Sequence, residues 1–200
     1  MIKNVVFDLG GVLLEYEPKR FLMSFGFKPE IMAALKKAVF EHDIWLELDR
    51  GTYTFAEAVE IIAGLNPGLD KEIRALFNEK RDLLFGEMHE SVAFMRRLKN
   101  EGYDIYFLSN FSREGFSFVE GKYGFLQEAK GRIISSAVGH IKPEPEIYLT
   151  LLNTYDLKPD ETVFIDDMEK NVEAARELGI RAIRFTDAND LKQKFREMSG

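Results

Sequence analysis

The chain has 200 residues, which is enough for one large domain or for one domain with a smaller cap. Its formal net charge is -7 and it has no long basic stripe, so we expect no nucleic-acid partner. It has 0 Cys, which excludes disulfides, a thiol nucleophile and a thiolate metal site. No stretch approaches a membrane span, and the first apolar run is too short for a secretory signal. We therefore expect a cytoplasmic protein without a membrane partner, and the sequence indicates no oligomeric state.

The first predicted strand is a short apolar run from Val5 to Phe7, which ends at Asp8 and is followed by Gly10 and Gly11. Such a run is typical of a buried strand in a parallel sheet. Ligands of open α/β sheets bind beyond the carboxyl ends of the strands. Asp8 is therefore a candidate nucleophile or metal ligand, and the alternative is a carboxylate that only forms its own turn.

The segment 15–88 carries a succession of predicted helices and no predicted strand. The helices are expected at residues 18–25, 29–39, 41–49, 54–65 and 71–85. Thr54 and Glu57 form a predicted capping box at the start of the fourth helix. Four aromatic residues are candidates for lining a pocket, although packing in the core is the more common role for each: Trp45, Phe40, Tyr53 and Tyr16.

From about residue 90, predicted strands alternate with predicted helices. The strands are expected at 103–108, 132–135, 162–165 and 182–185, and the helices at 90–101, 111–120, 145–155, 169–178 and 188–198. This alternation predicts an α/β fold with a parallel sheet. A crossover between parallel strands needs only about a dozen residues, and the helix at 90–101 already supplies it. Residues 15–88 are therefore a predicted insertion at the ligand-binding edge, where an insertion can act as a lid.

Polar side chains of one chemical theme follow the predicted strands. They are Asp8, Ser109, Asn110, Asp166 and Asp167, and Lys142 lies in a further loop. In a parallel sheet all these strand ends meet at one edge. Clustered carboxylates favour a hard cation such as Mg²⁺, and a hydroxyl, backbone amides and a lysine suit a phosphate. An Asp beside both can attack phosphorus, whereas each residue taken singly also fits a turn, a helix cap or a solvated surface.

These motifs, in this order, resemble those of the haloacid dehalogenase-like (HAD) hydrolase superfamily over nearly the whole chain. They are Phe7-Asp8-Leu9-Gly10-Gly11-Val12, then Leu108-Ser109-Asn110, then Lys142-Pro143, and finally Phe164-Ile165-Asp166-Asp167 with Asn171 beyond. Within the superfamily the chain is similar to the bacterial α-D-glucose-1-phosphate phosphatase branch. The segment Trp45-Leu46-Glu47-Leu48-Asp49-Arg50-Gly51 contributes to that similarity.

The resemblance implies a Rossmann-like parallel sheet with helices on both faces and an inserted helical cap. The expected core is residues 1–14 and 89–200, and the expected cap is residues 15–88. It also implies a phosphatase that hydrolyses a small phosphorylated metabolite, such as a sugar phosphate, through an aspartyl-phosphate intermediate with Mg²⁺.

The resemblance further assigns roles to particular residues. Asp8 would be the nucleophile, and Lys142 would steady both its carboxylate and the phosphate. Ser109, with Asn110, would bind the substrate. The Mg²⁺ ligands would be Asp8, the carbonyl of Gly10, Asp166 and Asp167, the last directly or through water.

Gly10 departs from the pattern of the family. Most phosphatases of the superfamily carry a second Asp two residues after the nucleophile, which protonates the leaving oxygen and later activates water. Substrates with good leaving groups, such as sugar 1-phosphates or acyl phosphates, depend less on such an acid. Glu15 or Glu17 is a candidate substitute because it is near in the sequence.

Two alternatives to a phosphatase stay open at this point. A 2-haloacid dehalogenase needs neither the acid nor a metal, but it has no use for the paired carboxylates of Asp166 and Asp167. A non-catalytic binding module is disfavoured because the chain has all four of the expected site residues Asp8, Ser109, Lys142 and Asp166.

Overall fold

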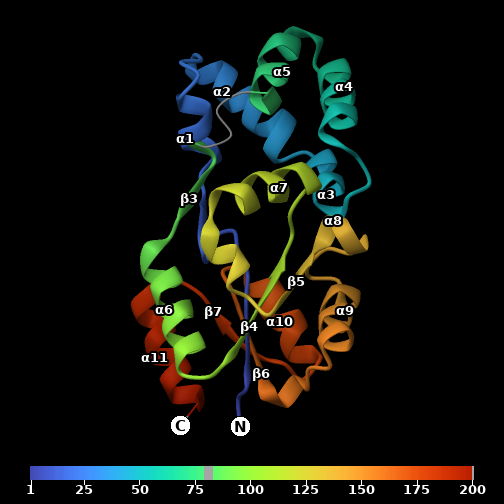
Figure 1. Cartoon of the computed structure of the whole chain (residues 1–200). Coiled ribbons are helices and arrows are strands. Elements are labelled where there is room, and N and C mark those ends of the chain that lie inside the picture. Colours follow the sequence, from blue (N-terminus) through green and yellow to red (C-terminus); the bar gives the residue numbers. More distant parts are fainter. Residues whose placement is uncertain (79–82, 200) are drawn as a thin grey trace.

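A five-stranded parallel sheet forms the lower half of the molecule (Figure 1). The structure is a computed structural model that describes residues 1–78 and 83–199. The strands, in the order β5-β4-β1-β6-β7, are Gly131–Ile134, Asp104–Ser109, Asn4–Phe7, Thr162–Asp166 and Arg181–Arg184. The central strand β1 sets Val5 opposite Ile105 on one side and opposite Val163 on the other. The predicted α/β fold is confirmed.

Helices cover both faces of this sheet, because successive side chains along a buried strand point to opposite sides. Val5 and Phe7 belong to one apolar cluster, and Val6 belongs to another. The first face is covered by α6 (His89–Asn100) and α11 (Ala188–Ser199), and the second by α9 (Pro145–Tyr155) and α10 (Glu169–Glu177) (Figure 1). These bounds agree closely with the predicted helices.

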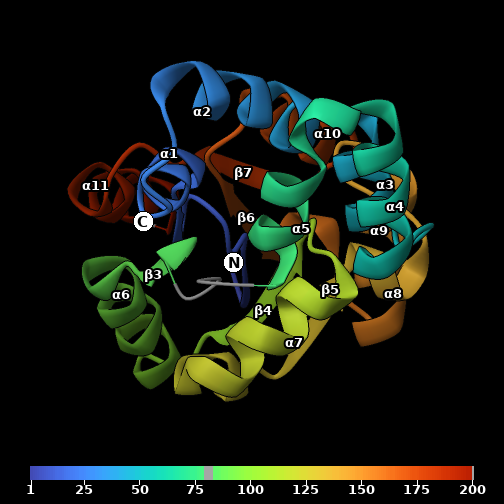
Figure 2. The same cartoon turned by 90° about the horizontal axis from the view of Figure 1, so that it is seen from above.

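A group of helices between residues 18 and 78, called the helical insert below, lies over the carboxyl ends of the strands (Figure 1 and Figure 2). Its helices are α1 (Pro18–Met23), α2 (Pro29–Leu35), α3 (Asp43–Arg50), α4 (Phe55–Leu65) and α5 (Asp70–Asn78). A π-helical turn, Lys36–Phe40, follows α2, and a 3-10 turn, Pro67–Leu69, precedes α5. The predicted capping box is present at α4, where Glu57 accepts a hydrogen bond of 2.8 Å from the N–H of Thr54.

Two short strands join the helical insert to the sheet, and the sequence did not predict them. Strand β2 (Leu14–Tyr16) pairs antiparallel with β3 (Phe85–Glu87). The helix predicted over 71–85 is therefore wrong at its end, because α5 stops at Asn78 and Phe85 begins a strand; residues 79–82 lie outside the described part. The expectation of no strand within 15–88 is wrong for the same reason: pairing with a distant segment satisfies the backbone there.

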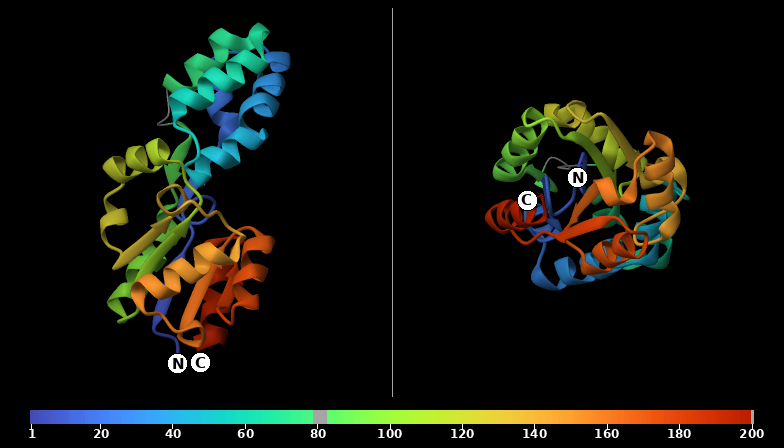
Figure 3. Two further views of the ribbon diagram at one scale, coloured as in Figure 1. Left: turned by 90° about the vertical axis from the view of Figure 1, so that its right-hand side faces the viewer. Right: turned by 90° about the horizontal axis from the view of Figure 1, so that it is seen from below.

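Further helices and turns complete the part of the chain around the sheet. They are α7 (Arg113–Lys122), α8 (Ser135–Val138) and the 3-10 turns Gly124–Gln127 and Pro159–Glu161. Both ends of the chain lie at the end of the molecule opposite the helical insert (Figure 3). Among the described residues, no helix combines the length and the apolar character needed to cross a bilayer. The cytoplasmic location stays a prediction.

Candidate active site

The turn after β1 presents Asp8 at the edge of the sheet. The backbone N–H of Asp8 still donates to the carbonyl of Ile165, at 2.9 Å, so the carboxylate emerges where the strand pairing ends. Gly11 follows with a φ of 73°. A Cβ at this glycine would lie 2.7 Å from Oδ2 of Asp167, so the turn requires a residue without a side chain.

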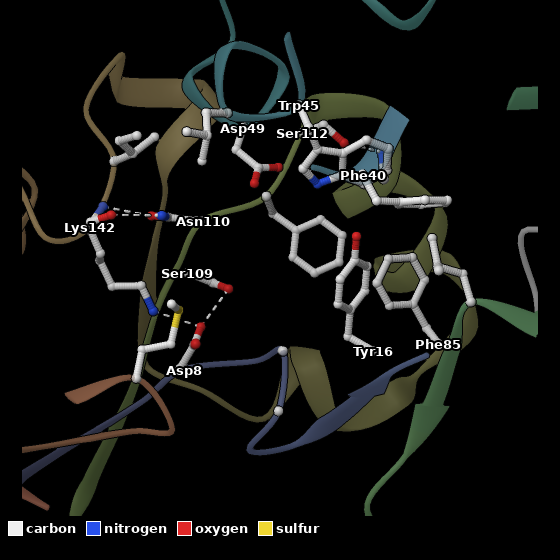
Figure 4. Close-up of a pocket in the computed structure, with 18 of the residues that line it drawn as sticks. Asp8, Tyr16, Phe40, Trp45, Asp49, Phe85, Ser109, Asn110, Ser112 and Lys142 are labelled. Carbon is white, nitrogen blue, oxygen red and sulfur yellow. Dashed lines mark hydrogen bonds and ion pairs between the residues drawn. The ribbon is translucent and has the colours of Figure 1, made fainter. Parts of the chain in front are cut away.

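Three donors converge on Oδ1 of Asp8. The N–H of Leu9 and the hydroxyl of Ser109 each donate to it at 2.7 Å. The ammonium of Lys142 lies 2.8 Å from the same oxygen (Figure 4). The structure therefore brings together Asp8, Ser109 and Lys142, which are separated widely in the sequence.

Lys142 also bridges to the next strand end. Its Nζ lies 2.6 Å from Oδ2 of Asp166, and its side chain is almost wholly buried. Asn110 fixes the backbone of Lys142 in both directions. The amide of Asn110 donates to the Lys142 carbonyl at 3.0 Å and accepts from the Lys142 N–H at 2.7 Å.

Asp166 is fully buried, and further hydrogen bonds hold its carboxylate. The N–H of Met168 donates to Oδ1 at 2.8 Å, and the amide of Asn171 donates to the same oxygen at 2.9 Å. Asn171 is itself buried. Its own Oδ1 is buried without a hydrogen-bond partner among the described residues.

The carboxylates of Asp8, Asp166 and Asp167 form a candidate cation site. One oxygen of each lies within 4.8 Å of the other two. Gly10 lines the cavity onto which Asp8 and Asp167 also open. Three carboxylates face one ammonium, that of Lys142, and so leave an excess of negative charge. An all-oxygen set with this charge, next to the unpartnered oxygen of Asn171, fits a hard divalent cation such as Mg²⁺.

Burial and crowding of charge shift the pKa values of this cluster. The pKa of Asp8 is raised to about 7, because burial and the charge of Asp166 outweigh the opposing charge of Lys142. The pKa of Asp167 is also raised, by burial and then by Asp166. Burial lowers the pKa of Lys142, but the charges of Asp166 and Asp8 outweigh this and raise it overall. Lys142 therefore stays protonated, whereas Asp8 gains its charge more readily when further positive charge is nearby.

A family model described as haloacid dehalogenase-like hydrolase matches residues 2–179. The chain belongs to this family. It is 27% identical over 214 residues to a D-ribitol-5-phosphate phosphatase of Bacteroides thetaiotaomicron, with 97% of each chain covered. It is 25% identical over 201 residues to a sesquiterpene phosphatase of Aspergillus oryzae, with 99% of this chain and 97% of the relative covered. Family and relatives together identify a HAD-like phosphoric monoester hydrolase.

Solved structures agree with this assignment. A HAD family enzyme of Bacteroides thetaiotaomicron, in complex with magnesium and inorganic phosphate, is 27% identical with a TM-score of 0.75. The match covers 93% of this chain and 95% of that one. An L-2-haloacid dehalogenase of Xanthobacter autotrophicus, at 18% identity and a TM-score of 0.67 over 98% and 83% of the two chains, shows the shared fold alone.

The active site of this HAD-like hydrolase opens into a cavity of about 580 Å³ between the sheet edge and the helical insert. Its floor is polar and holds Asp8, Ser109, Asn110, Lys142 and Asp167. Its walls are mainly apolar and aromatic: Phe21, Val39, Phe40, Trp45, Phe55, Leu76, Phe77, Leu84, Phe85, Phe111 and Phe118. The polar floor is suited to a phosphate, and the walls are suited to an apolar group attached to it.

The aromatic residues of the cavity form a continuous wall. The rings of Phe40 and Trp45 lie 4.9 Å apart, those of Trp45 and Tyr16 6.5 Å, and those of Tyr16 and Phe85 5.9 Å (Figure 4). Three of the four aromatic candidates from the sequence therefore line the cavity. The fourth, Tyr53, packs against the apolar cluster instead.

Asp49 is a cavity residue of this HAD-like hydrolase that the sequence analysis missed. It lies in the last turn of α3, at the negative end of the helix dipole, where an acidic side chain is disfavoured. That unfavourable position, two residues before the helix-ending Gly51, is the sequence signal by which Asp49 could have been identified. Glu15 and Glu17 do not line the cavity, so their proposed substitution for an acid at Gly10 is wrong. Glu15 instead pairs with Arg20 at 3.0 Å.

Proposed function

We propose that this HAD-like hydrolase is a Mg²⁺-dependent phosphatase that transfers the phosphoryl group of a small metabolite to Asp8 and then to water. The observation that supports this best is the position of Asp8. Its carboxylate is 2.7 Å from the Ser109 hydroxyl and 2.8 Å from the Lys142 ammonium, beside the cluster with Asp166 and Asp167. A carboxylate that attacks a phosphate ester meets like charge, and the Lys142 ammonium, together with a cation held by the carboxylate cluster, would offset the repulsion.

Each of the remaining site residues takes a defined part in this proposal. Leu9, Ser109 and Lys142 all bind Oδ1 of Asp8, which leaves Oδ2 as the attacking oxygen. Ser109 and Lys142 bind the transferred phosphoryl group, and Asn110 holds the Lys142 backbone and borders the substrate.

Asp8, Asp166, Asp167 and the Gly10 carbonyl would hold Mg²⁺, which when bound neutralises charge on the phosphoryl oxygens. Asn171 and Lys142 orient the Asp166 carboxylate for that purpose, through hydrogen bonds of 2.9 Å and 2.6 Å respectively. These partners keep the buried carboxylate of Asp166 fixed in position next to the two others.

We also propose that residues 1–14 and 89–200 form the core domain and that residues 15–88 form a cap. The paired strands β2 and β3 are a narrow connection between the two parts. Because the cavity is lined from both sides of that connection, closing the cap would exclude water from the phosphate.

Two substrate classes are candidates: sugar phosphates and the phosphates of apolar alcohols. The similarity to glucose-1-phosphate phosphatases and the glycine at position 10 favour a sugar phosphate with a good leaving group. The aromatic wall of Phe40, Trp45, Tyr16 and Phe85 favours the phosphate of an apolar alcohol, since sugar hydroxyls buried there would lose hydrogen bonds. One relative is named as a sesquiterpene phosphatase and another as a D-ribitol-5-phosphate phosphatase, so relatives support both classes.

The test is phosphate release with Mg²⁺ from glucose 1-phosphate, ribitol 5-phosphate, phenyl phosphate and farnesyl phosphate. We expect kcat/KM to be at least about tenfold higher for the apolar esters, because about 1.4 kcal/mol of apolar burial gives a factor of ten. A preference for the sugar or polyol phosphate would overturn the apolar class and leave the phosphatase standing.

The variant Asp8→Asn should lose turnover of every ester, whereas the exposed control Asp160→Asn should keep it. Retained turnover in Asp8→Asn would contradict the nucleophile assignment. Chloride release from 2-chloropropionate without metal, in the absence of any phosphate release, would favour the dehalogenase alternative.

A further inference from the structure

Position 10, where most phosphatases of the superfamily carry an acid, is a glycine in this chain. A Cβ built at Gly10 meets no atom of the described residues within 4 Å, so the space that such a side chain would fill is open. The neighbouring acids Glu15 and Glu17 are outside the cavity. A proton for the leaving oxygen must therefore come from another element.

We propose that Asp49, carried by the helical insert, is the general acid and base of this site. The inference rests on the proposed function. Asp49 lines the same cavity as Asp8 and is a carboxyl contributed by the insert and not by a strand end. Figure 4 shows its carboxylate pointing into the cavity from the side opposite Asp8 and Ser109. A phosphate ester bound at Asp8 would direct its leaving oxygen toward Asp49, because attack and departure lie in line.

Contacts with the core fix Asp49 in this position. The hydroxyl of Ser135 donates to the Asp49 carbonyl, and the backbone of Ser112 lies close enough to the Asp49 carboxyl to lower its pKa. The next residue, Arg50, forms two hydrogen bonds with Glu144, at 2.6 and 2.9 Å. Two segments of the core, at Ser135 and at Glu144, therefore hold the end of α3, which carries Asp49.

The surroundings of Asp49 suit a group that gives up and takes back a proton. Its pKa is raised to about 7, first by burial and then by the charge of Asp8. The backbone of Ser112 and the charge of Lys142 oppose this rise. The pKa of Tyr16 is raised too, first by burial and then by the charge of Asp49, so the Tyr16 hydroxyl nearby stays protonated. A general acid is most effective when its pKa is near the working pH.

The proposed reaction has two steps, phosphoryl transfer to Asp8 and then to water. Oδ2 of Asp8 bonds to phosphorus as the bond from phosphorus to the ester oxygen breaks, and the Asp49 carboxyl gives its proton to that oxygen to release the alcohol. The Asp49 carboxylate then takes a proton from water as the water oxygen bonds to phosphorus. The bond from phosphorus to Asp8 breaks, which releases inorganic phosphate and returns both residues to their starting forms.

The test separates the two half-reactions by leaving group. Asp49→Asn keeps the shape of the side chain, and Asp43→Asn, exposed on the same helix, is the matched control. With phenyl phosphate, whose leaving group needs a proton, single-turnover phenol release should fall about 10²–10⁴-fold in Asp49→Asn. With 2,4-dinitrophenyl phosphate, whose leaving group does not, the burst of dinitrophenol should keep its wild-type rate.

The same variant should then turn over slowly and accumulate the aspartyl phosphate, because the second step has lost its base. Adding Gly10→Asp to Asp49→Asn should restore phenyl phosphate cleavage, since the open space there accepts a second acid. Equal losses of burst rate with both substrates, or no rescue by Gly10→Asp, would overturn the role of Asp49 alone. A wild-type protein that cleaves neither ester would overturn the proposed function instead.

Discussion

Replacing Gly51 by alanine is expected to loosen the helical insert from the sheet and to slow catalysis. Gly51 ends α3 with a φ of 83°, directly after the segment that carries Asp49. A Cβ at this position would lie 2.5 Å from the carbonyl oxygen of Ser136 and 2.9 Å from its Cα. Both atoms are backbone, so no flexible side chain can move aside and the insert itself must shift.

The size of the effect follows from comparison with Gly102. That glycine has a φ of 97°, and a Cβ there meets no atom of the described residues within 4 Å. The left-handed backbone alone costs about 1–2 kcal/mol in either alanine variant. The close contact adds about 1–3 kcal/mol of overpacking at Gly51 only, for a total loss of about 2–5 kcal/mol.

Urea unfolding measures the difference in stability between Gly51→Ala and Gly102→Ala. Single-turnover cleavage of phenyl phosphate measures the displacement of Asp49, since a shift of about 1 Å in a reacting group can reduce the rate about 10²-fold. Gly102→Ala should keep the wild-type rate. Equal stability losses in the two variants, together with an unchanged rate in Gly51→Ala, would refute the view that this contact sets the position of the insert.

Two predictions concern the charge cluster without Mg²⁺. Since the pKa of Asp8 is raised from 3.8 to about 7, the folded protein holds between these values a proton that the unfolded chain has released, and stability falls as pH rises through this window. Asp8→Asn should therefore be more stable than wild type at about pH 8, on the order of 1–4 kcal/mol, and equally stable at about pH 4. Unfolding in EDTA checks this, and a wild-type protein as stable as the variant at both pH values would contradict it. Lys142→Met should lose about 3–5 kcal/mol of stability, because Asp8 and Asp166 then face each other without a cation. Its turnover should fall about 10²–10³-fold, and Mg²⁺ should recover stability but not turnover; a recovery of both would show that Lys142 only offsets charge.

The sheet and the residues at its edge could be predicted because one rule governs both. Strands that alternate with helices run parallel, so their carboxyl ends meet; Asp8 directly follows a strand, and Ser109 and Asp166 are each the last residue of one. Their contacts with one another depend only on that register. The position of Lys142 follows less directly from the sequence, because its contact with Asp8 depends on a loop that Asn110 holds in place.

Asp49 could not be predicted in the same way, because no periodicity relates it to the sheet. Its position depends on the pairing of Arg50 with Glu144 and on the close approach of Gly51 to Ser136. In each of these contacts the two partners are far apart in the sequence. The short strand at Phe85 was missed for a related reason. Three residues offer no alternation to recognise, and the strand exists because β2 lies beside it.

Carrying the acid on the insert instead of on the nucleophile loop has a consequence for specificity. With an acid at position 10, the core alone would hold both the nucleophile and the proton donor. With Gly10 and Asp49, the proton donor faces Asp8 only while the insert rests on the core through Arg50 and Gly51. The aromatic wall belongs largely to the same insert, so a ligand that fills it favours the arrangement in which the acid is in place. Recognition of the alcohol and cleavage of its phosphate are then coupled, because water in the cavity makes no favourable apolar contact with the aromatic wall and so does not stabilise this arrangement.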